Sequence, residues 1–344
     1  MKAILIRAHG GPEVLECSDA PKPAIGHGEV LIRVRACALN HLDLWVRRGL
    51  PGVKFPLPHI PGSDIAGEIA EVGPGVTSVS VGEKTVLAPG VGCGKCPACV
   101  SGIDNRCRQF SNLGYMLDGG YAEFVRAPEV NCLPFPENLS FEEAASVPLV
   151  FQTAWHMLVN RAELQPGEDI LILGAGSGVG IAAIQIAKFF GARVITTAGS
   201  EEKLAKAKAL GADELINHKT QKISAEVRRI TAKRGVDVVF EHVGTATWDE
   251  SFASLAASGR LVTCGATTGY DAKVDLRFLF AKQLSLLGSY MGTKSELHTV
   301  MKLVAAGRLK PIVDRVFPLT EAAAAHSYLE SSSQFGKVVL RVPS

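Results

Sequence analysis

Up to about residue 148, short apolar segments alternate with stretches rich in glycine, proline and polar residues. Each apolar segment has the length of a β-strand, and turn-forming residues bound it on both sides. The segments that we expect to form strands are 4–6, 30–34, 66–72, 85–87 and 122–125. This pattern predicts a β-rich, barrel-like first domain.

From Asp169 onward, continuous apolar runs alternate with segments of helical periodicity. A run such as Ile170–Leu173 is apolar at every position, which suits a parallel sheet covered by helices on both faces. The expected strands are 170–173, 193–197, 236–240, 261–264 and 284–288, and the first two expected helices are 178–190 and 201–210. The pattern predicts an α/β array of βαβ units.

Beyond residue 290, helical and extended segments are mixed, and we expect this tail to rejoin the first domain. The expected elements are helices near 295–306 and 321–331, an extended segment 311–318 and a final strand 337–342. The chain is therefore predicted to have a first domain at 1–148, a second at 149–289 and a returning segment at 290–344.

Composition narrows the class of protein. The chain has 344 residues, enough for two domains, and its 47% hydrophobic and 20% charged residues are typical of a fully folded globular enzyme. A net charge of +2, without blocks of like charge, argues against a nucleic-acid partner. Apolar runs fall short of the ~20 residues of a membrane span. The first residues resemble a strand more than a targeting signal, so we expect a cytoplasmic protein acting on a small-molecule substrate.

Four cysteines lie close together as C-x₂-C-x₂-C-x₇-C, at Cys93, Cys96, Cys99 and Cys107. Four thiolates from one loop can close a tetrahedron around Zn²⁺, leaving no position for water, so this spacing predicts one structural zinc ion per chain. Disulfides or a redox pair are the alternative, which the missing signal peptide disfavours. The other four cysteines are isolated, and we expect them to pack as small apolar side chains.

A glycine-rich turn follows the first strand of the second domain and precedes its first helix. Such a turn lets the backbone and the helix N-terminus approach a dinucleotide pyrophosphate, although a tight structural turn is the alternative, and the spacing differs from G-x-G-x-x-G. The candidate cofactor-binding residues in it are Gly174, Gly176, Ser177, Gly178, Val179 and Gly180.

The next strand ends in Ala198-Gly199-Ser200, where NAD enzymes usually carry an acidic residue that binds the ribose hydroxyls. Ser200 and Lys203 offer a hydroxyl and a cation for a 2′-phosphate. The sequence therefore favours NADP, with NAD possible if Lys203 is only a solvated helix residue.

Further motifs place the chain beside a known family. They are Gly28–Ile32 with Ala36-Cys37, Pro61–Gly67 with Val72-Gly73, Gly119–Phe124, and Thr153-Ala154-Trp155. With the cysteine cluster they resemble the medium-chain dehydrogenase/reductase superfamily, which includes zinc-containing alcohol dehydrogenases and quinone oxidoreductases.

This resemblance implies a GroES-like β-rich domain followed by a Rossmann domain with a doubly wound parallel sheet. It also implies a homodimer or homotetramer, joined through the strand near 284–288. The further cofactor contacts that it implies are His41, Thr153, Val243, Gly265 and Ala266.

Zinc-dependent members of the family carry a second, catalytic zinc on two cysteines and a histidine. This chain has Asn40, Ser63 and Leu149 in those places, and an amide, a hydroxyl and an alkyl group do not make that site. The segment around Asn40 is similar to the zinc-free reductases of the superfamily. Asn40 is the candidate catalytic donor, and turn formation at a strand end is its alternative role.

Three functions follow as hypotheses. The first is NADPH-dependent reduction of a polarised double bond in an enone, quinone or enoyl thioester, without catalytic zinc. The second is a zinc-dependent alcohol or aldehyde dehydrogenase with atypical ligands, drawn from neighbours such as His41, His59, Asp43 and Asp64. The third is a non-catalytic NADPH-binding structural or regulatory protein.

Overall fold

The computed structural model describes residues 1–343, which form two compact units. One unit comprises Met1–Leu149 together with the chain from Thr293 onward, and the other comprises Val150–Gly292. The predicted boundaries, 148/149 and 289/290, differ from 149/150 and 292/293 by one and three residues.

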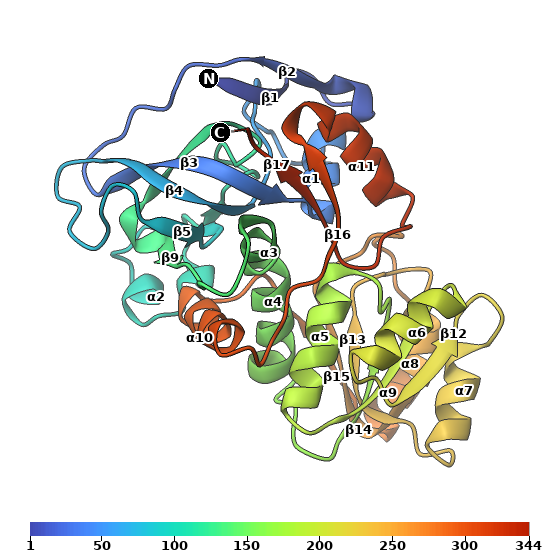
Figure 1. Ribbon diagram of the computed structural model, residues 1–344. Coiled ribbons are helices and arrows are strands. Elements are labelled where there is room, and N and C mark those ends of the chain that lie inside the picture. The colour runs from blue at the N-terminus through green and yellow to red at the C-terminus, as the bar shows by residue number, and fades with distance from the viewer. Residues whose placement is uncertain (344) are drawn as a thin grey trace. The chain divides into compact units, whose positions relative to one another are not determined.

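The first unit is built mainly from strands. Its principal sheet has the order β16-β17-β3-β4-β5-β9, and β8 also pairs with β3. All strands of the first unit, including those outside this sheet, are β1 Lys2–Ile6, β2 Leu15–Asp19, β3 Glu29–Ala38, β4 Asp64–Val72, β5 Lys84–Leu87, β6 Gly90–Val91, β7 Ser111–Asn112, β8 Phe124–Pro128, β9 Cys132–Pro134, β16 Val313–Pro318 and β17 Lys337–Arg341. In Figure 1 the red C-terminal strand β17 lies beside the blue strand β3, with which it pairs antiparallel, so the end of the chain completes a sheet begun near its start.

Short helices surround this sheet. They are α1 His41–Arg48, α2 Pro97–Val100, α3 Phe141–Ala145, α10 Lys294–Ala305 and α11 Ala322–Glu330, with single 3₁₀ turns η1 Pro12–Val14, η2 Asp104–Arg106, η3 Glu129–Asn131 and η5 Leu319–Glu321. A further helix, α4 Pro148–Trp155, contains the boundary between the two units.

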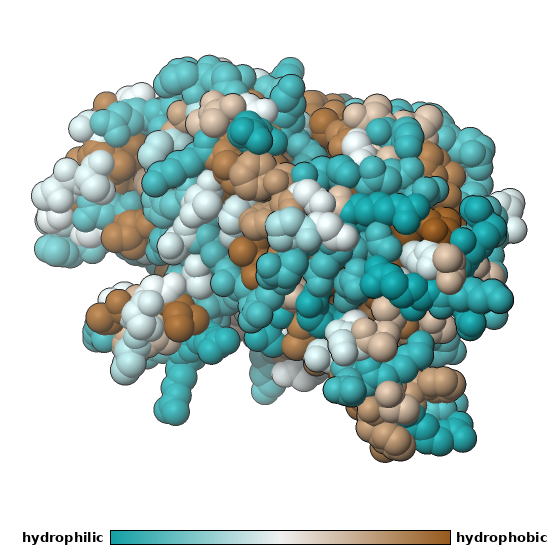
Figure 2. Space-filling view, turned by 90° about the horizontal axis from the view of Figure 1, so that it is seen from below, coloured by the Kyte–Doolittle hydropathy of each residue, from teal (hydrophilic) through white to brown (hydrophobic). Residues whose placement is uncertain are grey.

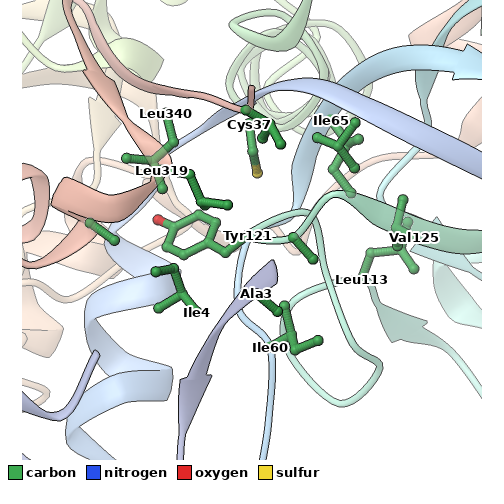
Figure 3. Close-up of a cluster of buried hydrophobic side chains, with 14 of the residues drawn as sticks. Ala3, Ile4, Cys37, Ile60, Ile65, Leu113, Tyr121, Val125, Leu319 and Leu340 are labelled. Atoms are coloured by element: carbon green, nitrogen blue, oxygen red, sulfur yellow. The ribbon is translucent and has the colours of Figure 1, made fainter. Parts of the chain in front are cut away.

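The core of the first unit surrounds the fully buried Tyr121. Figure 3 shows its ring among Ile4 of β1 and Leu319 and Leu340 of the C-terminal segment. Leu31 is buried on one face of β3, while the alternate residues at 30, 32 and 34 put the other face of the strand into this core, as its two-residue period requires. Burial of this face is the main force that holds the C-terminal segment to the N-terminal sheet.

The second unit contains a six-stranded sheet of order β12-β11-β10-β13-β14-β15, parallel throughout. Numbered along the chain, this is the order 3-2-1-4-5-6 of a doubly wound dinucleotide-binding sheet, which confirms the predicted fold class. The strands are β10 Asp169–Ile172, β11 Arg193–Ala198, β12 Glu214–Asn217, β13 Val236–Glu241, β14 Leu255–Thr263 and β15 Ser285–Gly288. The helices are α5 Gly178–Phe189, α6 Glu201–Ala209, α7 Ile223–Ile230, α8 Trp248–Ala253 and α9 Leu276–Ala281, preceded by the π-helical segment η4 His156–Arg161.

One strand of this sheet, β12, was not predicted. Its four residues contain only two apolar side chains, Leu215 and Ile216, which is too short a run to stand out in the sequence. Its identity as a strand depends on pairing with β11.

Apolar side chains form separate patches within a mostly hydrophilic surface on the face shown in Figure 2. Among residues 1–343, no helix has the length and hydropathy needed to cross a membrane.

Candidate functional site

The four predicted metal ligands come together in the loop that contains α2 and η2. The Sγ atoms of Cys93, Cys96, Cys99 and Cys107 all lie within 4.8 Å of one another. A tetrahedral zinc ion with Zn–S bonds of 2.3 Å needs sulfur atoms about 3.8 Å apart, so the cluster fits such an ion. Within residues 1–343 it is the one group of three or more His, Cys, Asp and Glu side chains found close enough to hold a metal.

Backbone N–H groups of the lobe donate to the sulfur atoms of Cys93 and Cys107, two of the four predicted ligands. The N–H groups of Cys93 and Gln109 donate to Sγ of Cys107 at 3.4 and 3.3 Å. Hydrogen bonds from the backbone N–H groups of Lys95 and Cys96 lower the pKa of the Cys93 thiol to about 6. Thiolates held by N–H donors are the form that binds zinc.

The cysteine lobe is also tied to the start of α10. The backbone N–H of Lys294 donates to Asp104 Oδ1 at 3.0 Å, and the Lys294 ammonium donates to Asn131 Oδ1 at 2.9 Å. Asn131 in turn donates to the carbonyl oxygens of Ala88 and Gly90. A metal in the lobe would therefore stabilise the first turn of α10 as well as its own loop.

In the second unit, the predicted glycine turn joins β10 to α5. Gly174 has φ +64°, and a Cβ atom at Gly180 would lie 2.4 Å from the carbonyl oxygen of Gly174, so both positions require glycine. Ser177 is the N-cap of α5, where its hydroxyl accepts from Gly180 N–H at 2.9 Å. The turn thus brings Gly174, Gly176, Ser177, Gly178, Val179 and Gly180 together at one helix N-terminus.

The His242 ring closes one side of this turn. Its Nε2 lies 2.9 Å from the carbonyl oxygen of Leu173, so Nε2 carries the proton and donates. Burial lowers the pKa of His242, which keeps the ring neutral beside Gly174. Nothing in the sequence pattern pointed to a role for His242.

The predicted 2′-phosphate residues follow β11, with Ser200 at the N-cap and Lys203 in the first turn of α6. Ser200 caps α6, accepting from Lys203 N–H at 3.4 Å. A Cβ atom at Gly199 would lie 3.0 Å from both His218 Nε2 and Lys219 Cε, so two more basic side chains from the end of β12 flank the same spot. Partial desolvation and the charges of Lys219 and Lys203 lower the pKa of His218, which shows that these groups are neighbours.

His218 and Lys219 were missed because β12 was missed. The run Glu-Leu-Ile-Asn-His-Lys contains only two apolar residues, too few to predict a strand, so the place of these two basic residues follows only from the pairing of β12 with β11.

The predicted nicotinamide-side residues Val243, Gly265 and Ala266 lie on two touching loops after β13 and β14. A Cβ atom at Gly265 would be 3.0 Å from the carbonyl oxygen of His242, so these loops pack backbone against backbone. The buried Glu241 carboxylate holds the first loop by accepting from Val243 N–H at 2.6 Å. Thr153, another predicted contact, is buried in α4.

In the first unit, Asn40 is the N-cap of α1 and is 7% exposed. Its Nδ2 donates to Asp64 Oδ2 at 2.9 Å, and its Oδ1 accepts from the Lys337 ammonium at 2.6 Å. Lys337 also donates to Asp64 Oδ2 at 3.0 Å, and the other Asp64 oxygen accepts from Leu149 N–H at 2.8 Å. Nothing in the sequence pattern pointed to Lys337. His41, the first residue of α1, is half-buried.

Asp43 lies behind Asn40 on α1 and is fully buried. Its carboxylate accepts from the backbone N–H groups of Asn40 at 2.7 Å and Gly62 at 3.1 Å. Burial raises the pKa of Asp43 to about 7, although the Asn40 hydrogen bond and the charge of Lys337 oppose this shift. Asp43 therefore joins the segment of Asn40 to the loop of Gly62.

The three positions that hold catalytic zinc in other members of the resembled family carry no zinc-binding side chain here. Asn40 is engaged by Lys337 and Asp64, the Ser63 hydroxyl is buried with no protein partner among residues 1–343, and Leu149 is aliphatic. His59, a possible substitute ligand, is buried with Nδ1 3.3 Å from the Asp118 carboxylate. These residues do not fit a Cys₂His zinc site.

Comparisons with known proteins match segments in both units of the chain. The family described as alcohol dehydrogenase GroES-like domain matches residues 26–137, and the family described as zinc-binding dehydrogenase matches residues 178–306. Quinone oxidoreductase of Rattus norvegicus is 33% identical over 99% of this chain and 97% of its own, and acryloyl-coenzyme A reductase of Metallosphaera sedula is 36% identical over 99% of each. A crystal structure of an NAD-dependent alcohol dehydrogenase superposes with a TM-score of 0.97 at 49% identity and full coverage of both chains.

The predicted family is thereby confirmed, since full-length relatives above 30% identity share both domains and their order. The chain belongs to the medium-chain dehydrogenase/reductase superfamily and is an NAD(P)-dependent oxidoreductase of that type.

Proposed function

We propose that the protein is an NADPH-dependent reductase of polarised carbon–carbon double bonds, in an enone, quinone or enoyl thioester, and that it works without a catalytic zinc ion. The observation that carries the proposal is the donor set at positions 40, 63 and 149, with the Lys337 ammonium 2.6 Å from Asn40 Oδ1. The Lys337 ammonium beside Asn40 repels a metal cation and so opposes metal binding at this position. Similarity to a quinone oxidoreductase and an acryloyl-coenzyme A reductase supports the same class of substrate.

When bound, NADPH supplies a hydride to the β-carbon of the double bond. Negative charge then develops on the substrate carbonyl oxygen, and we assign Asn40 to stabilise this oxygen through its amide N–H. A neutral donor fixed in advance within a largely buried site can stabilise such charge without a metal. A proton from water or a nearby acid completes the reaction at the α-carbon.

The second unit supplies the residues for the cofactor. The turn 174–180 and the N-terminus of α5 suit the pyrophosphate, because backbone N–H groups and the helix dipole both favour an anion. Lys203, His218 and Lys219, with Ser200, suit a 2′-phosphate and carry the preference for NADPH over NADH. Thr153, Val243, Gly265 and Ala266 are the further contacts proposed for this unit, and His41 is a contact that only the family resemblance implies.

The proposal includes one structural zinc ion on the four-cysteine lobe and a cytoplasmic location. None of the eight cysteines, all of which lie within residues 1–343, is joined in a disulfide.

An NAD-dependent alcohol dehydrogenase is the second candidate function. It is favoured by the 49% identity to a protein of that description, which is higher than the identity to either reductase named above. It requires a metal or another acid catalyst that the residues at 40, 63 and 149 do not supply.

Metal quantification combined with a substrate panel separates the two. The purified enzyme is assayed with NADPH and NADH against enones, quinones, an enoyl thioester and aldehydes, and with NAD⁺ and NADP⁺ against alcohols. We expect one zinc per chain and NADPH oxidation by an activated alkene or quinone. Two zinc ions per chain, with alcohol oxidation lost when the labile one is removed, would establish the second candidate instead.

A further inference from the structure

The network around Asn40 contains a buried positive charge that the family assignment leaves without a role. Lys337 is 4% exposed and Asp64 is fully buried, so this ion pair lies out of contact with water. A buried pair of this kind contributes little net stability in general, and its presence calls for another explanation.

Strand register delivers these residues to one place. β17 pairs antiparallel with β3 so that Val339 faces Ala38, and the same register continued by two residues places Lys337 opposite Asn40. On the other side of β3, Asp64 faces Ala38. The three side chains therefore meet at the end of β3, where α1 begins, although up to 297 residues separate them in sequence.

The partners decide which way the Asn40 amide points. An ammonium group can only donate and an ionised carboxylate can only accept, so Oδ1 must face Lys337 and Nδ2 must face Asp64. One Nδ2 hydrogen is used in the 2.9 Å bond to Asp64, whereas the other reaches only the Ala38 carbonyl oxygen at 3.5 Å, the weak limit for a hydrogen bond. Its direction is fixed with the rest of the planar amide, and this weakly bonded second N–H is the one left to donate to a substrate oxygen.

A cation on the oxygen of an amide also draws electron density from its nitrogen, which makes the N–H groups stronger donors. We propose that Lys337 is the positioning residue for Asn40: the buried ammonium fixes the amide orientation and strengthens its free-facing N–H as the donor to the substrate oxygen. This inference rests on the proposed reductase function. In that reaction the Lys337 ammonium takes the place of the fixed positive charge that a metal ion would supply. Lys337 acts only through Asn40.

The central test removes both charges of the buried pair together. Lys337→Met alone leaves Asp64 uncompensated and is expected to unfold readily, so the variant to assay is Lys337→Met with Asp64→Asn. We expect it to fold with a thermal midpoint near that of the parent and with kcat reduced on the order of 10²-fold, the usual loss for an oxyanion donor. KM and the Kd for NADPH should change less than about twofold, because only charge that develops in the transition state is affected.

Two further variants make the test specific. Asn40→Ala should reduce kcat to a similar extent by itself and should add almost nothing in the Lys337→Met/Asp64→Asn background, because the residues act as one unit. Lys188→Met is the control: it removes a lysine that pairs with Asp213 but whose side chain is 33% exposed, and it should leave kcat unchanged.

A readout without turnover is the side-chain ¹⁵NH₂ resonance of Asn40, identified by its loss in Asn40→Ala. We expect slower hydrogen exchange and a downfield position in the parent compared with Lys337→Met/Asp64→Asn. If the parent reduces no activated alkene or quinone but this resonance depends on Lys337, the proposed function fails and the positioning role stands. The inference would be overturned by any of three results. The first is full kcat in the folded Lys337→Met/Asp64→Asn variant, and the second is a loss of kcat that multiplies when Asn40→Ala is added. The third is a raised Kd for NADPH with unchanged kcat.

Discussion

The guanidinium group of Arg47 donates to Nδ1 of His326, with 3.3 Å between the two nitrogen atoms. Because arginine cannot accept, Nδ1 is the bare nitrogen, and Nε2 carries the proton that is donated to the Tyr121 hydroxyl at 3.1 Å. Arg47 lies on α1 and His326 on α11, so this chain of hydrogen bonds fastens the C-terminal segment to the helix that Asn40 caps. The Arg47 guanidinium group also forms an ion pair with Glu330.

The first prediction concerns the pH dependence of stability through His326. Burial, and then the charge of Arg47, lowers the pKa of His326 to about 3 from 6.5. Between pH 3 and pH 6.5 the unfolded chain binds a proton at His326 that the folded protein does not bind. The free energy of unfolding therefore has its full contribution from neutral His326 above pH 6.5. It loses this contribution as the pH falls toward 3, by up to about 1.4 kcal/mol per pH unit.

His326→Gln removes this contribution and is expected to destabilise the protein most at neutral pH. The difference in free energy of unfolding between parent and variant, from urea titrations at pH 4 to 8, should shrink as the pH falls below 6.5. A difference that stays constant over this range would mean that His326 does not remain neutral when buried.

The second prediction concerns zinc. Cys99→Ser should abolish the single zinc measured by elemental analysis and should lower the thermal midpoint, because the lobe loses the ion that closes it. Hydrogen exchange in the first turn of α10 should also increase, since Lys294 joins that turn to Asp104. Cys17→Ser, at an exposed and isolated thiol, is the control and should keep its zinc. If Cys99→Ser keeps its zinc, the four cysteines are not the ligands of that ion.

The third prediction concerns cofactor preference. Lys219→Ala should raise KM for NADPH by roughly tenfold or more, the value of a charge-assisted hydrogen bond to phosphate, and should leave KM for NADH unchanged. Lys208→Ala removes an exposed lysine of α6 that bonds to the Asp213 carbonyl instead, and it should affect neither cofactor. Equal effects of Lys219→Ala on both cofactors would show that no 2′-phosphate lies beside Gly199.

The fourth prediction concerns self-association through the second unit. The parallel sheet ends in the unpaired edge of β15, and α9 beside it exposes Leu276, Phe278 and Phe280, the last at 72%. Exposed apolar side chains beside an unpaired strand edge favour contact with a second copy of the chain.

We therefore expect a homodimer or homotetramer by light scattering, and Phe280→Glu should reduce its mass without loss of helical signal. Val81→Glu, at a 61% exposed position of the first unit, serves as the matched control and should not change the mass. A monomeric parent protein would refute the predicted assembly.

Sequence alone was sufficient where the chemistry is local. The four cysteines lie within fifteen residues, so their spacing predicted a metal lobe, and the consecutive strand, glycine turn and helix around Gly174 predicted a cofactor turn. The apolar periods of 2 and 3.6 residues likewise indicated which segments are strands and which are helices, because each period reports the face that must be buried.

Tertiary structure decided the rest. Lys337 meets Asn40 only through the register of β17 on β3, and His218 reaches Gly199 only because β12 lies next to β11 in the sheet. Register and strand order are set by burial summed over whole sheets, and no local pattern near Lys337 or His218 records that sum. The buried charge beside Asn40 and the basic edge beside Gly199 are therefore properties of the folded chain.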